Sequence, residues 1–160
     1  MTATASTPDH CPTDDGWVPI APFRAHFQRT VEQSGLSAFT VGQVCGITPA
    51  TARRLAGPAR RGKERIRWID ACAVYQVTAA TLEGMRQERV EAARSRRRLR
   101  RMVQQAPLAW VADFGDFREQ DLRHIAEGRW QQCSRLTEVR ILALSHLILE
   151  STSAVAQRAA

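Results

Sequence analysis

The twenty residues from Ala38 to Gly57 place small, apolar, turn-forming and capping residues in the order that two short helices joined by a tight turn require. Val41 and Cys45 lie four residues apart and therefore on one face of a first helix. Gly46 suits the left-handed conformation that ends such a helix. Thr48 follows as the N-cap of a second helix, with proline at its first position. The segment predicts a helix-turn-helix.

The second helix of this motif carries residue types that suit the major groove of DNA. Its inward positions are Ala52 and Leu55, which leaves a polar face pointing outward. Threonine can contact a thymine methyl group, and arginine can donate to guanine or to phosphate. The expected DNA-facing residues are Thr48, Ala50, Thr51, Arg53 and Arg54.

A fainter copy of the motif recurs 70 positions later, over Leu108–Glu127. We expect the same offset to continue, so that residues 65–74 match 135–144, whereas residues 27–33 match 99–105 at an offset of 72. At the offset of 70 the core positions keep their chemistry: Val41, Gly42, Ile47, Ala52, Arg53 and Leu55 fall on Val111, Ala112, Phe117, Leu122, Arg123 and Ile125.

The second copy differs at its turn and on its exposed face. Asp116 stands where Gly46 stands in the first copy, so we expect a turn of altered shape. The outward residues are more acidic, and carboxylates can accept from cytosine but repel phosphate. Two interpretations stay open: the second helix reads bases, or the unit binds protein instead. If it contacts DNA, the candidates are Arg118, Gln120, Arg123, His124, Arg129 and Arg135.

Basic residues are concentrated in the middle of the chain. The net charge is +7, and residues 53–101 hold fifteen of the 23 lysines and arginines against five acidic residues. Such a stretch, mostly arginine and next to a reading helix, indicates contact with the phosphate backbone of double-stranded DNA. The expected backbone contacts are Arg60, Arg61, Lys63, Arg65, Arg67, Arg96, Arg97, Arg98, Arg100 and Arg101.

The pattern predicts an all-α chain with two small helical domains. Residues 1–16 are expected to be disordered, residues 17–77 to form the helix-turn-helix domain, and residues 107–160 to form a C-terminal domain with the degenerate copy. Residues 57–67, rich in turn and basic types, are expected to form a loop. Between the domains, residues 78–106 predict one long basic helix of about 38 Å, close to one turn of DNA. The alternative is a flexible linker that breaks at Gly84 or Ser95.

Nothing in the sequence predicts an enzyme or a cofactor. The four cysteines form no C-x-x-C pair and the four histidines are scattered, so we expect buried thiols and no metal site. No paired carboxylates, Ser-His-Asp set or phosphate-binding glycine loop stands out. The start of the chain lacks the features of a signal peptide, and its apolar runs are too short to span a bilayer, which indicates the cytoplasm and no membrane partner.

The segment WVPIAPFRAHFQ followed by GITPATARRLAG resembles helix-turn-helix proteins of actinobacteria and their phages. The arrangement over residues 17–150 is similar to the immunity repressors of temperate mycobacteriophages, with the first motif as its specific part. The resemblance implies a monomeric repressor in the bacterial host cell. It would bind asymmetric operators and repeated stoperator sites and silence lytic genes during lysogeny. In this resemblance the two unlike helices read one asymmetric site.

The apolar helix VRILALSHLILE, residues 139–150, supports a second hypothesis. Its apolar side chains are spread widely enough to serve a core alone, or a core together with a partner surface. In the second case the protein is a DNA-binding regulator with one reading helix, whose C-terminal domain mediates homodimerisation or partner binding.

Overall fold

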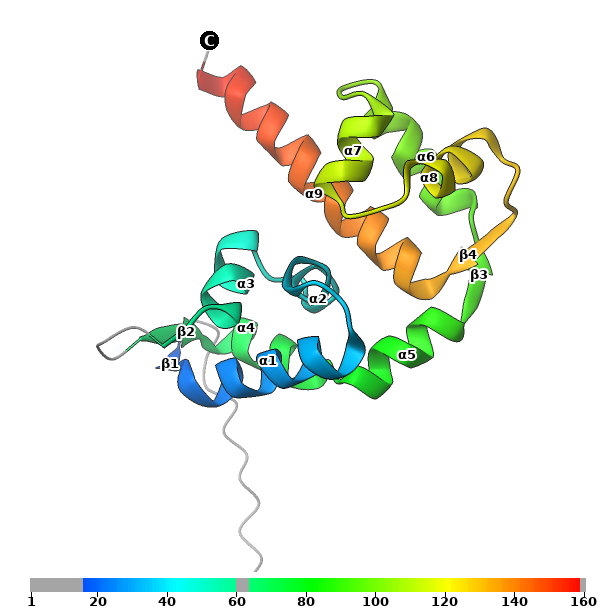
Figure 1. The fold of residues 1–160 in the computed structure, drawn as a ribbon. Helices are drawn as coiled ribbons and strands as arrows, with labels where there is room; N and C mark the ends of the chain where they lie inside the picture. The colour runs from blue at the N-terminus through cyan, green and yellow to red at the C-terminus, as the bar shows by residue number, and fades with distance from the viewer. Residues whose placement is uncertain (1–15, 60–63, 159–160) are drawn as a thin grey trace, which may run out of the picture.

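The computed structural model describes residues 16–59 and 64–158, with side chains as far as residue 148. Within these residues the chain is mainly helical, as expected, with nine helices and four short strands that form two separate two-stranded sheets (Figure 1). The strands were not expected from the sequence. The N-terminal segment predicted to be disordered lies outside the described residues, except for Gly16.

The same order of elements occurs twice along the chain. The first unit, residues 17–76, consists of β1 (Trp17–Pro19), α1 (Ala21–Ser34), α2 (Ala38–Cys45), α3 (Pro49–Ala56), β2 (Arg65–Arg67) and α4 (Trp68–Gln76). The second unit, residues 89–158, consists of β3 (Arg89–Glu91), α6 (Ala93–Val103), α7 (Leu108–Phe114), α8 (Glu119–Glu127), β4 (Gln132–Ser134) and α9 (Arg135–Arg158). Helix α5 (Ala79–Gln87) connects them.

Each unit is closed by an antiparallel pair of strands in the same register. Val18 lies opposite Ile66 in the first sheet, and Val90 lies opposite Cys133 in the second. The prediction of a loop over 57–67 is therefore wrong for its last three residues. The sequence signal for strand β2 is weak, because the strand has three residues and only Ile66 is buried. The alternation of apolar and polar residues is therefore too short to predict a strand.

The predicted long helix over 78–106 is also wrong. It ends at Gln87, and strand β3 separates α5 from α6. The break is at neither Gly84 nor Ser95, which both lie inside helices. Local propensity favours a helix here, but β3 is stabilised by pairing with β4, more than forty residues further along the chain. The 38 Å spacer between the two units does not exist.

The repeat continues beyond the two motifs, but with a changed offset. β3 and α6 follow β1 and α1 at 72 residues, and α7 and α8 follow α2 and α3 at 70, as expected. β4 and the start of α9 follow β2 and α4 at 67 residues, so the expected match of 65–74 with 135–144 is wrong by three. The backbone bonds agree: the amide of Trp68 donates to Gly16 and that of Arg135 donates to Glu88.

Each unit has its own apolar core beneath its strand pair. Phe27, Val41 and Leu55 belong to the first core, and their counterparts Leu99, Val111 and Ile125 belong to the second. In the first unit, α2 and α3 approach each other closely at Gly42. A Cβ atom on Gly42 would lie 2.6 Å from that of Ala52, so a larger residue would push α2 and α3 apart.

The two turns have the same shape, which corrects the prediction of an altered second turn. Gly46 has φ of +69° and Asp116 has φ of +55°, both in the left-handed region. The amides of Ile47 and Phe117 donate to the equivalent carbonyls of Gly42 and Ala112. Aspartate is among the few residue types other than glycine that adopt this conformation at modest cost.

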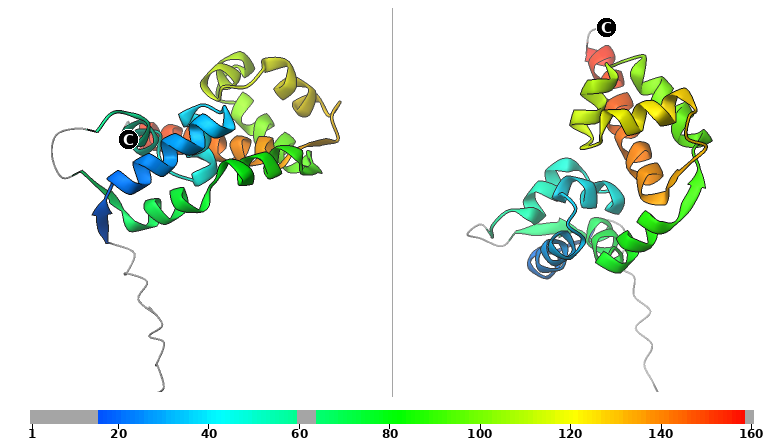
Figure 2. Two further views of the ribbon diagram at one scale, coloured as in Figure 1. Left: turned by 60° about the horizontal axis from the view of Figure 1, so that its bottom comes forward. Right: turned by 45° about the vertical axis from the view of Figure 1, so that its right-hand side comes forward.

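Helix α9 joins the two units into one body. It runs between α2 of the first unit and α6 of the second (Figure 1 and the right-hand view of Figure 2). Leu136 near its start packs in the first core, whereas Ile141 and Leu144 pack in the second. Phe39 on α2 also meets Phe114 on α7 edge to face, with 5.8 Å between ring centroids. No described helix is both long enough and apolar enough to cross a bilayer.

Candidate nucleic-acid interface

Helix α3 presents the polar face that the sequence predicted. The Thr48 hydroxyl caps it, accepting a hydrogen bond from the Thr51 amide at 3.1 Å. Ala52 and Leu55 are buried, which turns the other side of the helix outward. The outward set consists of Thr48, Ala50, Arg53 and Arg54, which are exposed, and Thr51, which is half-buried and shares a hydroxyl hydrogen bond with Thr48.

The C-terminal end of α3 is held by α1. The Arg24 guanidinium donates to the Arg54 carbonyl and forms an ion pair with Glu64. One turn later on α1, Gln28 donates to the carbonyls of Ala56 and Gly57. These carbonyls would otherwise lack partners at the end of a helix. Helix α3 is therefore fixed at both ends. Neither bracing residue was predicted as functional, because their role appears only when α1 is packed on α3.

The arginines on α3 and β2 differ in how many hydrogen bonds and ion pairs their side chains form. The Arg53 guanidinium has no hydrogen bond or ion pair with any described residue. Arg54 donates to the Arg65 carbonyl at 2.9 Å, which fastens α3 to β2. Arg65 itself donates to the Trp17 carbonyl. Arg67 forms a two-point ion pair with Asp70, whose hydrogen bond and charge raise the pKa of the guanidinium. The predicted contacts Arg60, Arg61 and Lys63 lie outside the described residues.

Helix α6 divides its arginines between two faces. Arg96 donates to the carbonyls of Ile125 and Trp130, and Arg100 donates to that of Ala126, so both hold α8. These two are structural braces, which weakens their prediction as backbone contacts. The other face carries four arginines that we call the basic ridge: Arg94, Arg97, Arg98 and Arg101. Their side chains surround one hollow on the surface and form no ion pair with any described acidic residue.

Arg94 was not among the predicted contacts. Its spacing from Arg97, Arg98 and Arg101 was the available signal, since residues three, four and seven apart share one face of a helix. The prediction treated the whole arginine run alike. Only the packing of α6 on α8 separates the ridge from the braces.

The predicted contacts of the second unit are mostly engaged with other groups. Arg123 is paired with Glu119, Arg129 with Glu127 at 2.8 Å, and Arg135 with Glu138. The His124 ring is half-buried beside Trp130, with 5.3 Å between ring centroids. Of the six, Arg118 and Gln120 are exposed, and their side chains have no hydrogen-bond or ion-pair partner in the described part of the chain. Helix α8 therefore offers a far less basic surface than α3.

Two groups near the turns, the buried Cys45 thiol and the partly buried Arg140 guanidinium, have shifted pKa values. Burial raises the pKa of the Cys45 thiol to about 12 from its ordinary value of 9.0, which keeps the thiol neutral. Burial lowers the pKa of Arg140, while the nearby Asp116 carboxylate opposes that shift. Arg140 donates to the carbonyls of Gly115 and Asp116 and lies 4.0 Å from the Phe117 ring centroid, so it supports the second turn from α9.

Searches for similar proteins find no matching family model, no matching curated protein and no matching solved structure. Within the described residues, no three metal-binding side chains come together. What this surface binds is therefore inferred from its own residues.

Proposed function

We propose that this protein is a sequence-specific regulator that binds double-stranded DNA, with α3 lying in the major groove. The supporting observation is the face of α3, which is capped, braced at its far end and lined by exposed Thr48, Ala50, Arg53 and Arg54. A rigid helix that presents an unpaired arginine beside small residues can approach base edges closely.

The second unit repeats this helix-turn-helix arrangement but contributes to DNA binding through α6. The ridge of Arg94, Arg97, Arg98 and Arg101 supplies four guanidinium groups without acidic partners among the described residues. Arginine binds phosphate oxygens through a fork of donors, so the ridge suits the DNA backbone. The paired and acidic surface of α8 makes it a poorer reader than α3.

A monomer with unlike surfaces of this kind reads an asymmetric site. Together with the resemblance of its first motif to phage immunity repressors, this favours a repressor that acts in the cytoplasm of a bacterial host. Repression follows where the bound site overlaps a promoter.

Selection of bound sites from random DNA, followed by titration of variants, tests this function. Arg53→Ala should weaken binding to the selected site by about 1–3 kcal/mol and change its base preference. Arg97→Ala should weaken all sequences alike and reduce the slope of log affinity against log salt by about one. Arg123→Ala, the counterpart of Arg53 on α8, is the matched control and should change neither. No enrichment of any sequence, or equal losses in all three variants, would contradict the proposal.

A second candidate role is partner binding by the second unit. Trp110 and Phe114 on α7 stack at 5.0 Å between centroids and yet remain 47% and 42% exposed. Aromatic side chains of this kind are enriched in protein interfaces. Sedimentation velocity of the wild type and Trp110→Ala tests it. A dimer that dissociates in the variant, together with palindromic selected sites, would favour this role over a monomer on an asymmetric site.

A further inference from the structure

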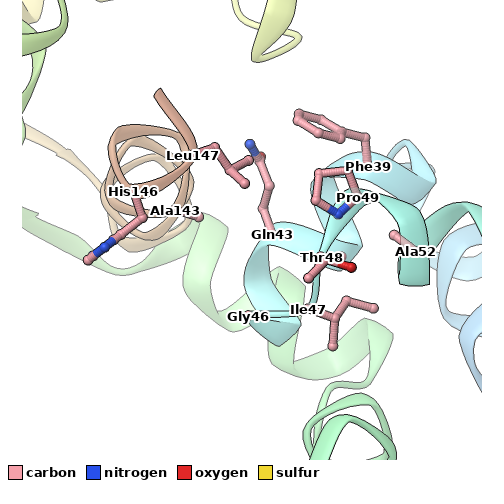
Figure 3. A pocket seen from close by; sticks show the side chains of 11 residues that line it. Phe39, Gln43, Gly46, Ile47, Thr48, Pro49, Ala52, Ala143, His146 and Leu147 are labelled. Atoms are coloured by element: carbon pink, nitrogen blue, oxygen red, sulfur yellow. The ribbon is translucent and has the colours of Figure 1, made fainter. Parts of the chain in front are cut away.

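A hollow of about 270 Å³ lies between the first unit and helix α9 (Figure 3). One wall comes from α2, the turn and the first turn of α3, and the other comes from α9. Its lining is mainly apolar, and it is open to solvent on one side. The volume is slightly below the roughly 300–1,000 Å³ of pockets that hold drug-sized molecules. The side chains that matter below are Phe39, Gln43, Thr48, Pro49, Ala143 and Leu147.

Gln43 is the one polar side chain of this lining that is almost completely buried without a partner among the described residues. It is 5% exposed, and neither its amide nitrogen nor its amide oxygen makes a hydrogen bond. In Figure 3 the side chain rises from α2 and ends between Phe39 and Leu147. A buried amide left unpaired is unfavourable, so this group favours a molecule that supplies the missing partners.

We propose that this hollow binds a small, mainly apolar molecule that carries a carboxamide or lactam group. Such a group presents a carbonyl acceptor and an N–H donor side by side. The Gln43 amide nitrogen would donate to the ligand carbonyl, and the Gln43 amide oxygen would accept from the ligand N–H. Phe39 and Leu147 lie on either side of the end of the Gln43 side chain, so the apolar part of the ligand would pack against them. The ligand class follows from the paired polar edge of Gln43 within an apolar lining.

A ligand in this position would contact both units at once. Thr48 and Pro49 begin α3, whereas Ala143 and Leu147 belong to α9. Occupancy therefore stabilises the packing of α9 against the start of the helix proposed to read DNA. Binding of the ligand does not depend on the proposed function; only an effect of the ligand on DNA binding rests on it.

Nuclear magnetic resonance of the full chain with benzamide as the probe tests the site. Benzamide combines one ring with a carboxamide, and toluene is the matched probe without the polar edge. In the wild type, benzamide should shift the Gln43 side-chain NH₂ signals and the methyl signals of Ala143 and Leu147, and toluene should bind more weakly. Gln43→Leu should lower the benzamide affinity at least fivefold and raise that for toluene. Gln87→Leu, which removes an exposed amide on α5, should leave both affinities unchanged.

The proposal is overturned if saturating benzamide shifts none of these wild-type signals, because solvent or side-chain movement then fills the hollow. Equal benzamide affinity in the wild type and Gln43→Leu overturns it as well, since the amide would have no part in recognition. Both readouts are taken without DNA. Failure of the DNA-selection experiment therefore leaves them unaffected, and the two proposals fail separately.

Discussion

The two units share their internal bracing and differ in what they expose. Arg24 and Arg96 occupy equivalent positions on α1 and α6. Arg24 donates to a carbonyl near the end of α3, and Arg96 donates to one near the end of α8. On the outside, the Arg53 side chain has no hydrogen-bond or ion-pair partner among the described residues, whereas its counterpart Arg123 is paired with Glu119. Contacts within each unit therefore hold the shared framework of the repeat, while the charges on its outer surface differ between the units.

The turns show the same separation in a single position. Gly46 adopts the left-handed conformation with no hydrogen bond to its backbone from a described side chain, whereas the Asp116 carbonyl accepts a hydrogen bond from Arg140. The two turns have the same backbone conformation, but among the described residues only the second receives a side-chain hydrogen bond from α9. A side-chain contact from α9 can therefore replace the conformational freedom of glycine.

Equivalent core truncations should have the largest effect and should be equal. Leu55 and Ile125 are both fully buried at matching positions. Leu55→Ala and Ile125→Ala should each lower the free energy of unfolding by about 2–5 kcal/mol. Because α9 packs in both cores, each variant should shift one common transition in urea denaturation. Two separate transitions, each moved by one variant only, would show that the units fold independently.

Removing the two braces should have unequal effects. Arg24→Ala leaves the half-buried Glu64 carboxylate without its ion pair to this residue and should lower the free energy of unfolding by about 3 kcal/mol. Arg96→Ala removes hydrogen bonds to carbonyls near solvent and should cost about 1–2 kcal/mol. Chemical denaturation measures both. Equal losses would mean that the Arg24 to Glu64 pair adds nothing beyond the carbonyl contacts.

Alkaline pH should destabilise the protein through Cys45, for which the second unit has Gly115 instead. The folded thiol has a pKa of about 12 and the unfolded thiol about 9, so the unfolded chain loses its proton first as the pH rises. The stabilisation is complete below pH 9 and falls by about 1.4 kcal/mol per pH unit above it. Cys45→Ala should remove this part of the slope, which the difference between the two unfolding curves isolates. Parallel curves would contradict a buried neutral thiol.

Substitutions at the two turn residues should give the smallest changes in the free energy of unfolding, and the two changes should have opposite signs. Gly46→Ala should cost about 1 kcal/mol, because a Cβ has free space there but disfavours a positive φ. Asp116→Gly should stabilise by about 0.5 kcal/mol, because it relieves the same conformation. Thermal unfolding monitored by circular dichroism would resolve both. Destabilisation by Asp116→Gly would show that the aspartate side chain supports the turn.

The first unit could be predicted well because its signals are local. Pro22 at the start of α1, Gly35 at its end, and Thr48 as a cap act within one turn of chain. The outward face of α3 followed from the spacing of Ala52 and Leu55 alone. The candidate surface on α3 was therefore available from the sequence.

The second candidate surface was predicted only in part. Helical spacing groups Arg94, Arg97, Arg98 and Arg101 on one face of α6 and Arg96 and Arg100 on another, but it does not say which face α8 covers. Their roles separate when α8 covers one face of α6. Similarly, the ion pairs of Arg123 and Arg129 depend on side chains whose orientation the sequence does not specify.

The helical class, the positions of the two repeated segments and the exposed face of α3 follow from the sequence alone, because periodicity, caps and turn residues act over a few neighbouring positions. Tertiary contacts are responsible for the break at β3, the pairing of β3 with β4, and the position of α9 between the two units. These depend on residues more than forty positions apart, whose contacts outweigh the helical propensity of the basic segment. The hollow beside Gln43 exists for the same reason, since one wall comes from residues 39–52 and the other from residues 143–147.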